Sequence, residues 1–466
     1  MLNKKQIIII ASSVLAFIVV IIFIVTISSS DNNIPNVISL PLKTYYSYSD
    51  ISSLFKNNIK TTITMSDKNQ EIDLFLQPKD YGFFITQQDI LFKKFDNSQI
   101  NKFSKNFYDY EYSSSIKILS ERKKFAFSQY NFGRKAQENF ILCEKDLCSD
   151  NSIKLNEFKF MLVEDPFDKI SGGIGLSPGD TFENEAENFI EQLYNRKYIN
   201  QKVWYINYDK NNIEKKLIIG KYPYEIDDGL ENTDYTFFDI KNKDWEMEML
   251  NIRIGNDAEN QENFIKEKNF VFNQDSSLIF GPYEYYQKIK NIFFNKYLAD
   301  NKCSENMFEF QLLEYLYINC NTDISLDDFP PLIIDINNYF KFELTQKDLF
   351  IKSDNRIIFL FITNKIEKYS GKWYMGEPFL SKYKPAYNQK DKKIGFYDVI
   401  LKNQKSYKVF GIIGFIFFVI CTGILIYLCL YLFRKYRNKK IRKAAMEMRI
   451  EEISNKLIKD QKENNI

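Results

Sequence analysis

Two long runs of uncharged, mostly apolar residues lie near the two ends of the chain, at residues 7–27 and 409–433. A helix of about 20 apolar residues is long enough to cross the hydrocarbon core of a bilayer. We therefore predict that residues 1–29 are either a cleaved signal peptide or a retained signal anchor. Residues 409–433 are predicted to be a transmembrane helix, which makes the lipid bilayer an expected partner.

The stretch that follows the second run is strongly basic. It contains Arg434, Lys435, Arg437, Lys439, Lys440, Arg442 and Lys443. Such a cluster marks the cytosolic side of a membrane, so residues 434–466 are expected to form a basic cytosolic tail. The chain would then be a single-pass or two-pass membrane protein. Its body would be lumenal or extracellular, in the secretory or endolysosomal system or at the cell surface.

The body between the two runs has the pattern of a β-rich protein. Short apolar or alternating stretches are separated by polar clusters, which is typical of β-strands. Strands are predicted at residues 60–65, 72–76, 203–208, 216–219 and 332–336. Helical periodicity is confined to a few places, chiefly residues 185–194 and 283–297. The many aromatic residues, 42 Phe and 31 Tyr, also favour strands, so we predict an all-β class with few short helices.

Length, charge and the absence of histidine narrow the function. A chain of 466 residues is long enough for two or three folded units. Its 63 basic and 61 acidic side chains nearly balance, so nucleic acid is not an expected partner. With no histidine, the chain has neither a Ser-His-Asp triad nor a histidine metal site. We expect no metal and no cofactor, and any chemistry must use carboxylates, hydroxyls or lysines.

Four cysteines of the body fall into two close couples, Cys143 with Cys148 and Cys303 with Cys320. An oxidising compartment would allow each couple to close a small loop, so we predict two disulfides. Neither couple has the CxxC spacing of a zinc site.

The most specific motif lies in residues 373–397, WYMGEPFLSKYKPAYNQKDKKIGFY. This stretch is similar to the closing element of the pepsin-like aspartic peptidases, in which a Gly-x-x-Phe turn and a Tyr precede a strand ending Ile-Gly-Phe. The residues that carry the likeness are Gly376, Phe379, Tyr383, Ile394, Gly395 and Phe396.

Further motifs follow in the family's order. The segment 112–115, then Tyr130 and Gly133, resemble the family's Ser-rich run and flap hairpin, which implies that Tyr130 and Gly133 contact substrate. The run 172–176 resembles the Gly-rich segment of the N-terminal lobe, and 189–208 resembles a helix and a strand of the inter-lobe sheet.

The resemblance implies a bilobal pepsin-like fold, the acid protease fold, flanked by the two membrane segments. Residues 30–58 would be a linker, residues 59–225 the N-terminal lobe and residues 226–405 the C-terminal lobe. The family's cleft between the lobes holds an extended peptide or protein segment, and we expect a monomer.

The resemblance implies that both catalytic aspartates of the family are replaced in this sequence. The alignment through Gln70 puts Gln77 at the first position, and the alignment through Gly281 and Pro282 puts Asn273 at the second. A carboxamide cannot accept a proton from water near neutral pH, so neither residue can act as the general base. In place of the family's glycines the chain has Lys79 and Asp275, for which we hypothesise an opposite-charge pair.

Three functions follow from this interpretation. The leading one is a membrane-anchored pseudoprotease that binds a peptide or protein without cleaving it. The first alternative is an active aspartic endopeptidase that uses displaced aspartates, Asp80 and Asp275. The second is a structural or adhesive ectodomain whose likeness to the family is accidental.

Overall fold

The computed structural model describes the greater part of the body and one segment of the tail. The described residues are 37–44, 51–56, 58–65, 70–94, 106–109, 111, 113–124, 132–142, 152–165, 170–179, 188–208, 215–240, 245–255, 269–310, 312–337, 339–353, 355–364, 373–401, 431 and 434–454. The chain divides into two compact units, residues 1–400 and residues 401–466. In the second unit, residues 434–454 form a helix.

Several of the predictions fall outside these residues. They are the run 7–27, nearly all of the run 409–433, the couple Cys143 and Cys148, and Tyr130. Of the helices that the structure does describe, none is long and apolar enough to cross a membrane.

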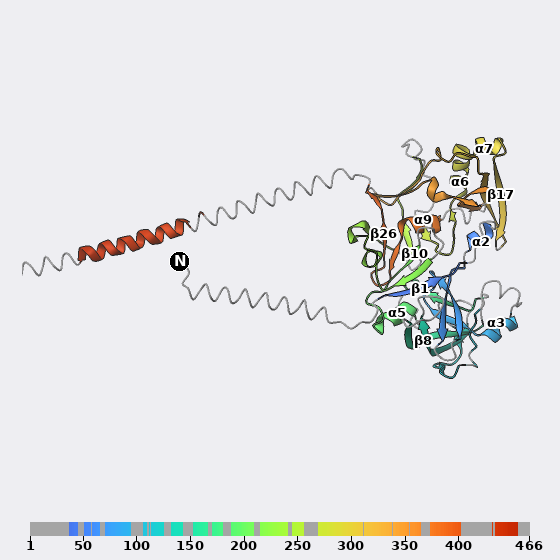
Figure 1. Cartoon of the computed structure of the whole chain (residues 1–466), viewed down its shortest axis with the longest axis horizontal. Helices are drawn as coiled ribbons and strands as arrows, with labels where there is room; N and C mark the ends of the chain where they lie inside the picture. Colours follow the sequence, from blue (N-terminus) through green and yellow to red (C-terminus); the bar gives the residue numbers. More distant parts are fainter. Residues whose placement is uncertain are drawn as a thin grey trace, which may run out of the picture. The chain divides into compact units, whose positions relative to one another are not determined.

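A six-stranded antiparallel sheet joins segments from both halves of the first unit. Its strands, in order across the sheet, are β1 (Ile38–Leu42), β11 (Lys215–Ile219), β10 (Val203–Tyr208), β25 (Ala386–Asn388), β26 (Lys393–Tyr397) and β12 (Tyr235–Asp239). In Figure 1, β1, β10 and β26 lie along one side of both halves. Trp204 and Tyr387 pair across β10 and β25 and are almost completely buried, so this central sheet has a packed apolar face.

The N-terminal half is built on an eight-stranded sheet. Its strands, in order, are β2 (Lys60–Met65), β3 (Glu71–Gln77), β9 (Gly172–Gly175), β4 (Phe83–Thr86), β8 (Ile153–Asp165), β7 (Phe132–Leu142) and β5 (Lys117–Ile118), with β6 (Lys123–Lys124) also beside β7. The alternation of the long strands places Phe140 and Phe160 against Phe83, and the three rings contact one another edge to face or tilted. These rings form the centre of the core of this half.

The C-terminal half contains a nine-stranded and a four-stranded sheet. The larger one has the order β13 (Glu246–Glu248), β15 (Asn269–Phe272), β24 (Trp373–Met375), β16 (Ile279–Phe280), β23 (Phe361–Asn364), β18 (Leu313–Asn321), β22 (Arg356–Phe359) and β21 (Phe350–Ser353), with β17 (Cys303–Phe310) beside β18. The smaller one has the order β14 (Asn251–Ile254), β19 (Leu332–Asp335), β20 (Phe340–Leu344) and β27 (Ile400–Leu401).

The helices described in the first unit are short. They are α2 (Ile51–Phe55), α3 (Gln88–Lys94), α5 (Phe189–Asn195), α6 (Tyr283–Ile289), α7 (Asn295–Ala299), α8 (Gln346–Leu349) and α9 (Glu377–Tyr383), with the short turns η3 (Pro223–Glu225), η4 (Asn232–Asp234) and η6 (Lys290–Phe294). The Asn188 side chain caps α5 by accepting a hydrogen bond from the Glu191 N–H, which satisfies an otherwise unpaired donor of the first turn.

The elements predicted from periodicity are confirmed. All five predicted strands are present, as β2, β3, β10, β11 and β19, and the two predicted helices correspond to α5 and to the run α6–η6–α7. Cys303 and Cys320 face each other across β17 and β18 and form the predicted disulfide. The prediction of a mostly β architecture with few short helices is therefore confirmed. The prediction of two flanking membrane segments falls outside the described residues.

Candidate functional site

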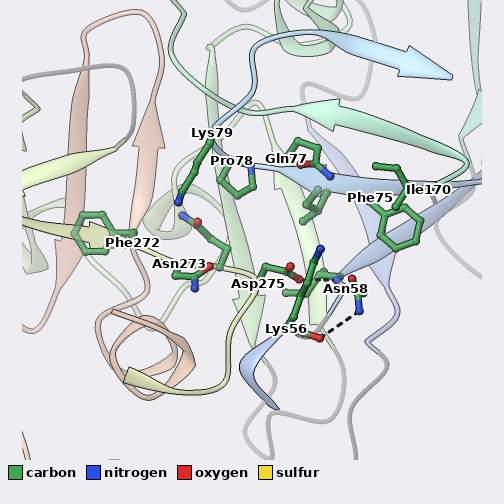
Figure 2. Close-up of a pocket in the computed structure, with 13 residues that line it drawn as sticks. Lys56, Asn58, Phe75, Gln77, Pro78, Lys79, Ile170, Phe272, Asn273 and Asp275 are labelled. Carbon is green, nitrogen blue, oxygen red and sulfur yellow. Dashed lines mark hydrogen bonds between the residues drawn. The ribbon is translucent and has the colours of Figure 1, made fainter. Parts of the chain in front are cut away.

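A pocket of about 290 Å³ is lined by three segments of the first unit and by Ile170, which lies just before β9 (Figure 2). One segment follows α2, the second follows β3, and the third follows β15. The lining residues are Lys56, Asn58, Ile59, Phe75, Leu76, Gln77, Pro78, Lys79, Ile170, Phe272, Asn273, Gln274 and Asp275. Both Gln77 and Asn273 are among them, so residues 196 positions apart in the sequence meet at one site.

The N-terminal wall of the pocket is a turn at the end of β3. Gln77 is the last residue of β3, which pairs in parallel with β9, while β4 pairs with β9 in antiparallel fashion. The carbonyl oxygen of Gln77 accepts hydrogen bonds from the N–H groups of Asp80 and Leu176, at 3.2 and 3.0 Å. A Cβ atom on Gly175 would collide with the Tyr81 backbone, so only glycine permits this close approach.

The C-terminal wall repeats this arrangement. Asn273 follows β15, which pairs in parallel with β24, while β16 pairs with β24 in antiparallel fashion. The carbonyl oxygen of Asn273 accepts a 3.4 Å hydrogen bond from the Ser276 N–H, as Gln77 does from Asp80. A Cβ atom on Gly376 would collide with the backbone of Leu278. Gln77 and Asn273 therefore occupy corresponding places in two similar substructures.

The third wall is the segment that crosses from the C-terminal half to the N-terminal half. Its first part, α2, is fixed to the C-terminal half because Leu54 O accepts a 2.8 Å hydrogen bond from the Ser277 N–H. Farther along, the Ile59 N–H donates to Asp275 Oδ1 at 3.1 Å, and Ile59 O accepts from the Leu76 N–H at 3.0 Å. Lys56, Asn58 and Ile59 thus line the pocket, and Ile59 contacts both of its other walls.

The charged groups of the pocket do not pair as hypothesised. Lys79 lies with its Nζ 5.4 Å from the centroid of the Tyr374 ring, whereas Asp275 accepts the backbone hydrogen bond from Ile59. Figure 2 shows Lys79 and Lys56 reaching toward the pocket from opposite sides, with Asp275 on the side of Lys56. The hypothesised ion pair between Lys79 and Asp275 is wrong, because these two described residues form no salt bridge with each other and contact other groups instead.

Burial changes the ionisation of Asp275. Loss of hydration raises the pKa of Asp275 to about 6, although the hydrogen bond from Ile59 and the charge of Lys56 act in the opposite direction. Asp275 is the one carboxylate among the described lining residues. The pocket therefore offers a single acid with a raised pKa and two lysines.

Two other predicted site residues, Asp80 and Gly133, are described by the structure and do not line the pocket. Asp80, the partner of Asp275 in the displaced-dyad alternative, is not among the lining residues. Gly133 lies in β7 opposite Val163, buried against the Leu162 carbonyl, and does not line the pocket either. Of the alternative dyad, the structure thus brings only Asp275 to the site.

Sequence reasoning missed the polar network behind the pocket. Gln274 is buried and its Nε2 donates to the Tyr387 hydroxyl at 2.6 Å. Burial raises the pKa of Tyr387, so its hydroxyl keeps its proton. Lys215 and Glu377 form an ion pair of 2.8 Å, and the Ser277 hydroxyl donates to the same carboxylate at 2.6 Å. One signal for this network was present in the sequence, since Gln274 directly follows Asn273.

The pocket is also lined by a residue that no motif indicated. Lys56 directly follows α2, in a stretch that was predicted to be a linker. The polar side chains among the described lining residues are two ammonium groups, which only donate, four carboxamides, which donate and accept, and the carboxyl group of Asp275. In the part of the chain that the structure describes, no cluster of residues suited to a metal ion is present.

A family model described as eukaryotic aspartyl protease matches residues 89–399, which is more than half of the chain. The matched range includes Asn273 and Asp275 and begins after Gln77. No curated protein matches the chain in sequence.

Proposed function

This chain belongs to the family of eukaryotic aspartyl proteases, and from that premise we propose that it is a membrane-anchored, catalytically inactive member that binds a peptide or protein segment in its pocket. Hydrolysis in this family requires two carboxylates that share a proton, so that one can act as a base while the other donates a hydrogen bond. The observation that supports the proposal is the placement of two amides, Gln77 and Asn273, at corresponding turns beside the same pocket. An amide does not take a proton from water near neutral pH.

Binding without turnover fits the rest of the pocket. Ile170, which is half-buried, provides apolar surface for a side chain, and the amides provide hydrogen-bond donors and acceptors for a backbone. An extended peptide gains affinity from its main-chain hydrogen bonds and specificity from alternate side chains. The pocket could therefore hold a segment of a partner protein without a reaction.

A location in the secretory or endolysosomal system or at the cell surface is part of the proposal. It is supported by the two hydrophobic runs and the basic cluster after the second run. The disulfide between Cys303 and Cys320 also fits a compartment outside the reducing cytosol.

One observation favours the alternative of an active acid endopeptidase. Asp275 lines the pocket, and its pKa is raised to about 6, in the range where a carboxyl can exchange protons during catalysis. The alternative still needs a second acid, and Asp80 does not line the pocket. We therefore rank it second.

Purified full-length protein in detergent micelles separates the two functions. Its hydrolysis of a broad peptide library is measured between about pH 3 and 7, the range in which shared-proton dyads work, with and without a pepstatin-type inhibitor. We expect no inhibitor-sensitive turnover, and we expect peptides to be retained uncleaved. Inhibitor-sensitive cleavage that disappears in the Asp275→Asn variant would establish the enzyme instead. Far-ultraviolet circular dichroism of both proteins controls for folding.

A further inference from the structure

The charge of the pocket is opposite to what an acid dyad provides. Two lysines, Lys56 and Lys79, line it together with one carboxylate, that of Asp275. The formal charge of these groups is therefore positive when Asp275 is ionised and more positive when it is protonated. A site of this sign attracts an anion and repels a cation.

The single carboxylate is already engaged within the protein. Asp275 accepts a hydrogen bond from the Ile59 N–H, and the charge of Lys56 acts on it through space. Lys79 is exposed and packs over the Tyr374 ring, with no carboxylate partner among the described residues. The attraction of an exposed ammonium group to an aromatic ring is weak, so a ligand carboxylate can compete for Lys79.

The amides supply the directional part of the site. Neither the Gln77 nor the Asn273 side chain has a hydrogen-bond partner among the residues that the structure describes, and both side chains are half-buried. Each carboxamide carries two N–H donors, and donors beside a cation bind a carboxylate oxygen more strongly than a neutral one. The volume of about 290 Å³ exceeds that of a single water, roughly 30 Å³, and leaves room for an amino-acid side chain or a chain end.

We propose that the pocket binds a carboxylate of its peptide ligand, held by the ammonium groups of Lys56 and Lys79 and by the amides of Gln77 and Asn273. This inference rests on the proposed function and specifies its ligand class. The carboxylate can belong to the C-terminus of a peptide or to an Asp or Glu side chain. The replacement of two acidic groups by a site of positive charge would then change the class of ligand that the pocket binds.

Fluorescence polarisation tests the proposal with full-length protein in detergent micelles. The probes are fluorescein-labelled dodecapeptides drawn from the retained library members, each made in three forms. The first form has a free C-terminus, the second a C-terminal amide, and the third a C-terminal amide with every Asp and Glu replaced by Asn and Gln. We expect the third form to bind at least 10-fold more weakly than the best carboxylate form, and the second form tells the two carboxylate sources apart.

Three variants test the residues. Lys79→Gln and Lys56→Gln are each expected to weaken binding of the carboxylate form of the probe about 5-fold to 10-fold. Binding of the neutral form should be unchanged. Asp275→Asn removes the competing negative charge and keeps an oxygen for the Ile59 N–H, so we expect it to tighten the carboxylate form several-fold. Lys393→Gln, at a half-exposed lysine of β26, is the matched control and should change nothing. Added salt should weaken the carboxylate form selectively.

The outcomes separate the inference from the proposed function. Equal affinity for charged and neutral forms, or equal weakening of both forms by Lys79→Gln, would overturn the carboxylate site and leave peptide binding intact. If no peptide is retained at all, the carboxylate site is tested by itself. The melting temperature of the protein is measured with acetate and with acetamide at equal ionic strength. If acetate raises the melting temperature of the wild type but of neither lysine variant, the carboxylate site is supported and the proposal of peptide binding is rejected. No selective stabilisation would reject both.

Discussion

At the scale of single residues, Asp275 is the group whose charge the fold controls most directly. Burial raises the pKa of Asp275 to about 6 from its ordinary value of 3.8. A carboxyl whose pKa is higher in the folded than in the unfolded state stabilises the fold at low pH. That stability is lost as the pH rises through the folded pKa.

The Asp275→Asn variant tests this linkage. Relative to wild type, the variant should gain about 2 kcal/mol of unfolding free energy between pH 4.5 and pH 7, from about 1.4 kcal/mol per pKa unit. Urea denaturation at the two pH values measures the gain. The amide oxygen still accepts the hydrogen bond from Ile59. If the free-energy difference between the two proteins does not change with pH, Asp275 titrates normally and the raised pKa is refuted.

Residue identities at the site were partly predictable. The resemblance to the pepsin-like family pointed to Gln77 and Asn273, and both line the pocket. The same spacing could not show that Asp275 turns toward Ile59 or that Lys79 lies over Tyr374. Those contacts depend on side-chain directions in turns that lie far apart in the sequence and meet only in the tertiary structure.

At the scale of elements, α2 holds the crossing segment against the C-terminal half. Figure 1 shows this N-terminal helix beside β17 of the C-terminal half. The Phe55 ring contacts Phe308, Phe310 and Tyr315, with ring centroids 5.9, 5.0 and 4.7 Å away. Because Lys56 directly follows, the packing of α2 sets where that ammonium group enters the pocket.

The Phe55→Ala variant should therefore weaken both stability and ligand capture. Removing a half-buried ring is expected to cost about 2 kcal/mol of unfolding free energy, below the cost for a fully buried Phe. It should also weaken the carboxylate form of the probes more than the neutral form. Leu312 lies between β17 and β18, the two strands that the Phe55 ring contacts, and is 89% exposed. The Leu312→Ala variant serves as control and should lose less than about 0.5 kcal/mol of unfolding free energy. Equal effects of the two substitutions would mean that α2 does not position Lys56.

At the scale of the whole molecule, the central six-stranded sheet makes the two halves of the first unit one folding unit. Tyr387 stacks on Trp204 at 4.1 Å and contacts Trp245 at 5.0 Å. The Trp245 Nε1–H in turn donates to Leu176 O at 3.0 Å, directly beside the turn that carries Gln77. Contacts of this kind couple the pocket walls to the shared sheet.

Tyr387→Phe tests this coupling. The variant removes the hydroxyl that accepts the Gln274 Nε2–H and leaves a buried amide without its partner, which costs about 1–3 kcal/mol. Calorimetry of the full chain should show one unfolding transition for the two halves together. In the Tyr387→Phe variant this transition should occur at a lower temperature than in the wild type. The Tyr339→Phe variant, at a 54% exposed position, is the control and should leave the temperature of the unfolding transition unchanged. Two separate transitions, of which only one shifts, would contradict the single unit.

The sequence by itself determined the strands and the short helices, because burial that recurs with the period of a strand or a helix is a local property. Only the tertiary structure decided the composition of the pocket. The parallel pairing of β3 with β9 and of β15 with β24 joins segments about 100 residues apart, and no local pattern specifies such a partner. That pairing, with the crossing of α2 to the other half, brings Lys56, Lys79 and Asp275 together and gives the pocket its sign of charge.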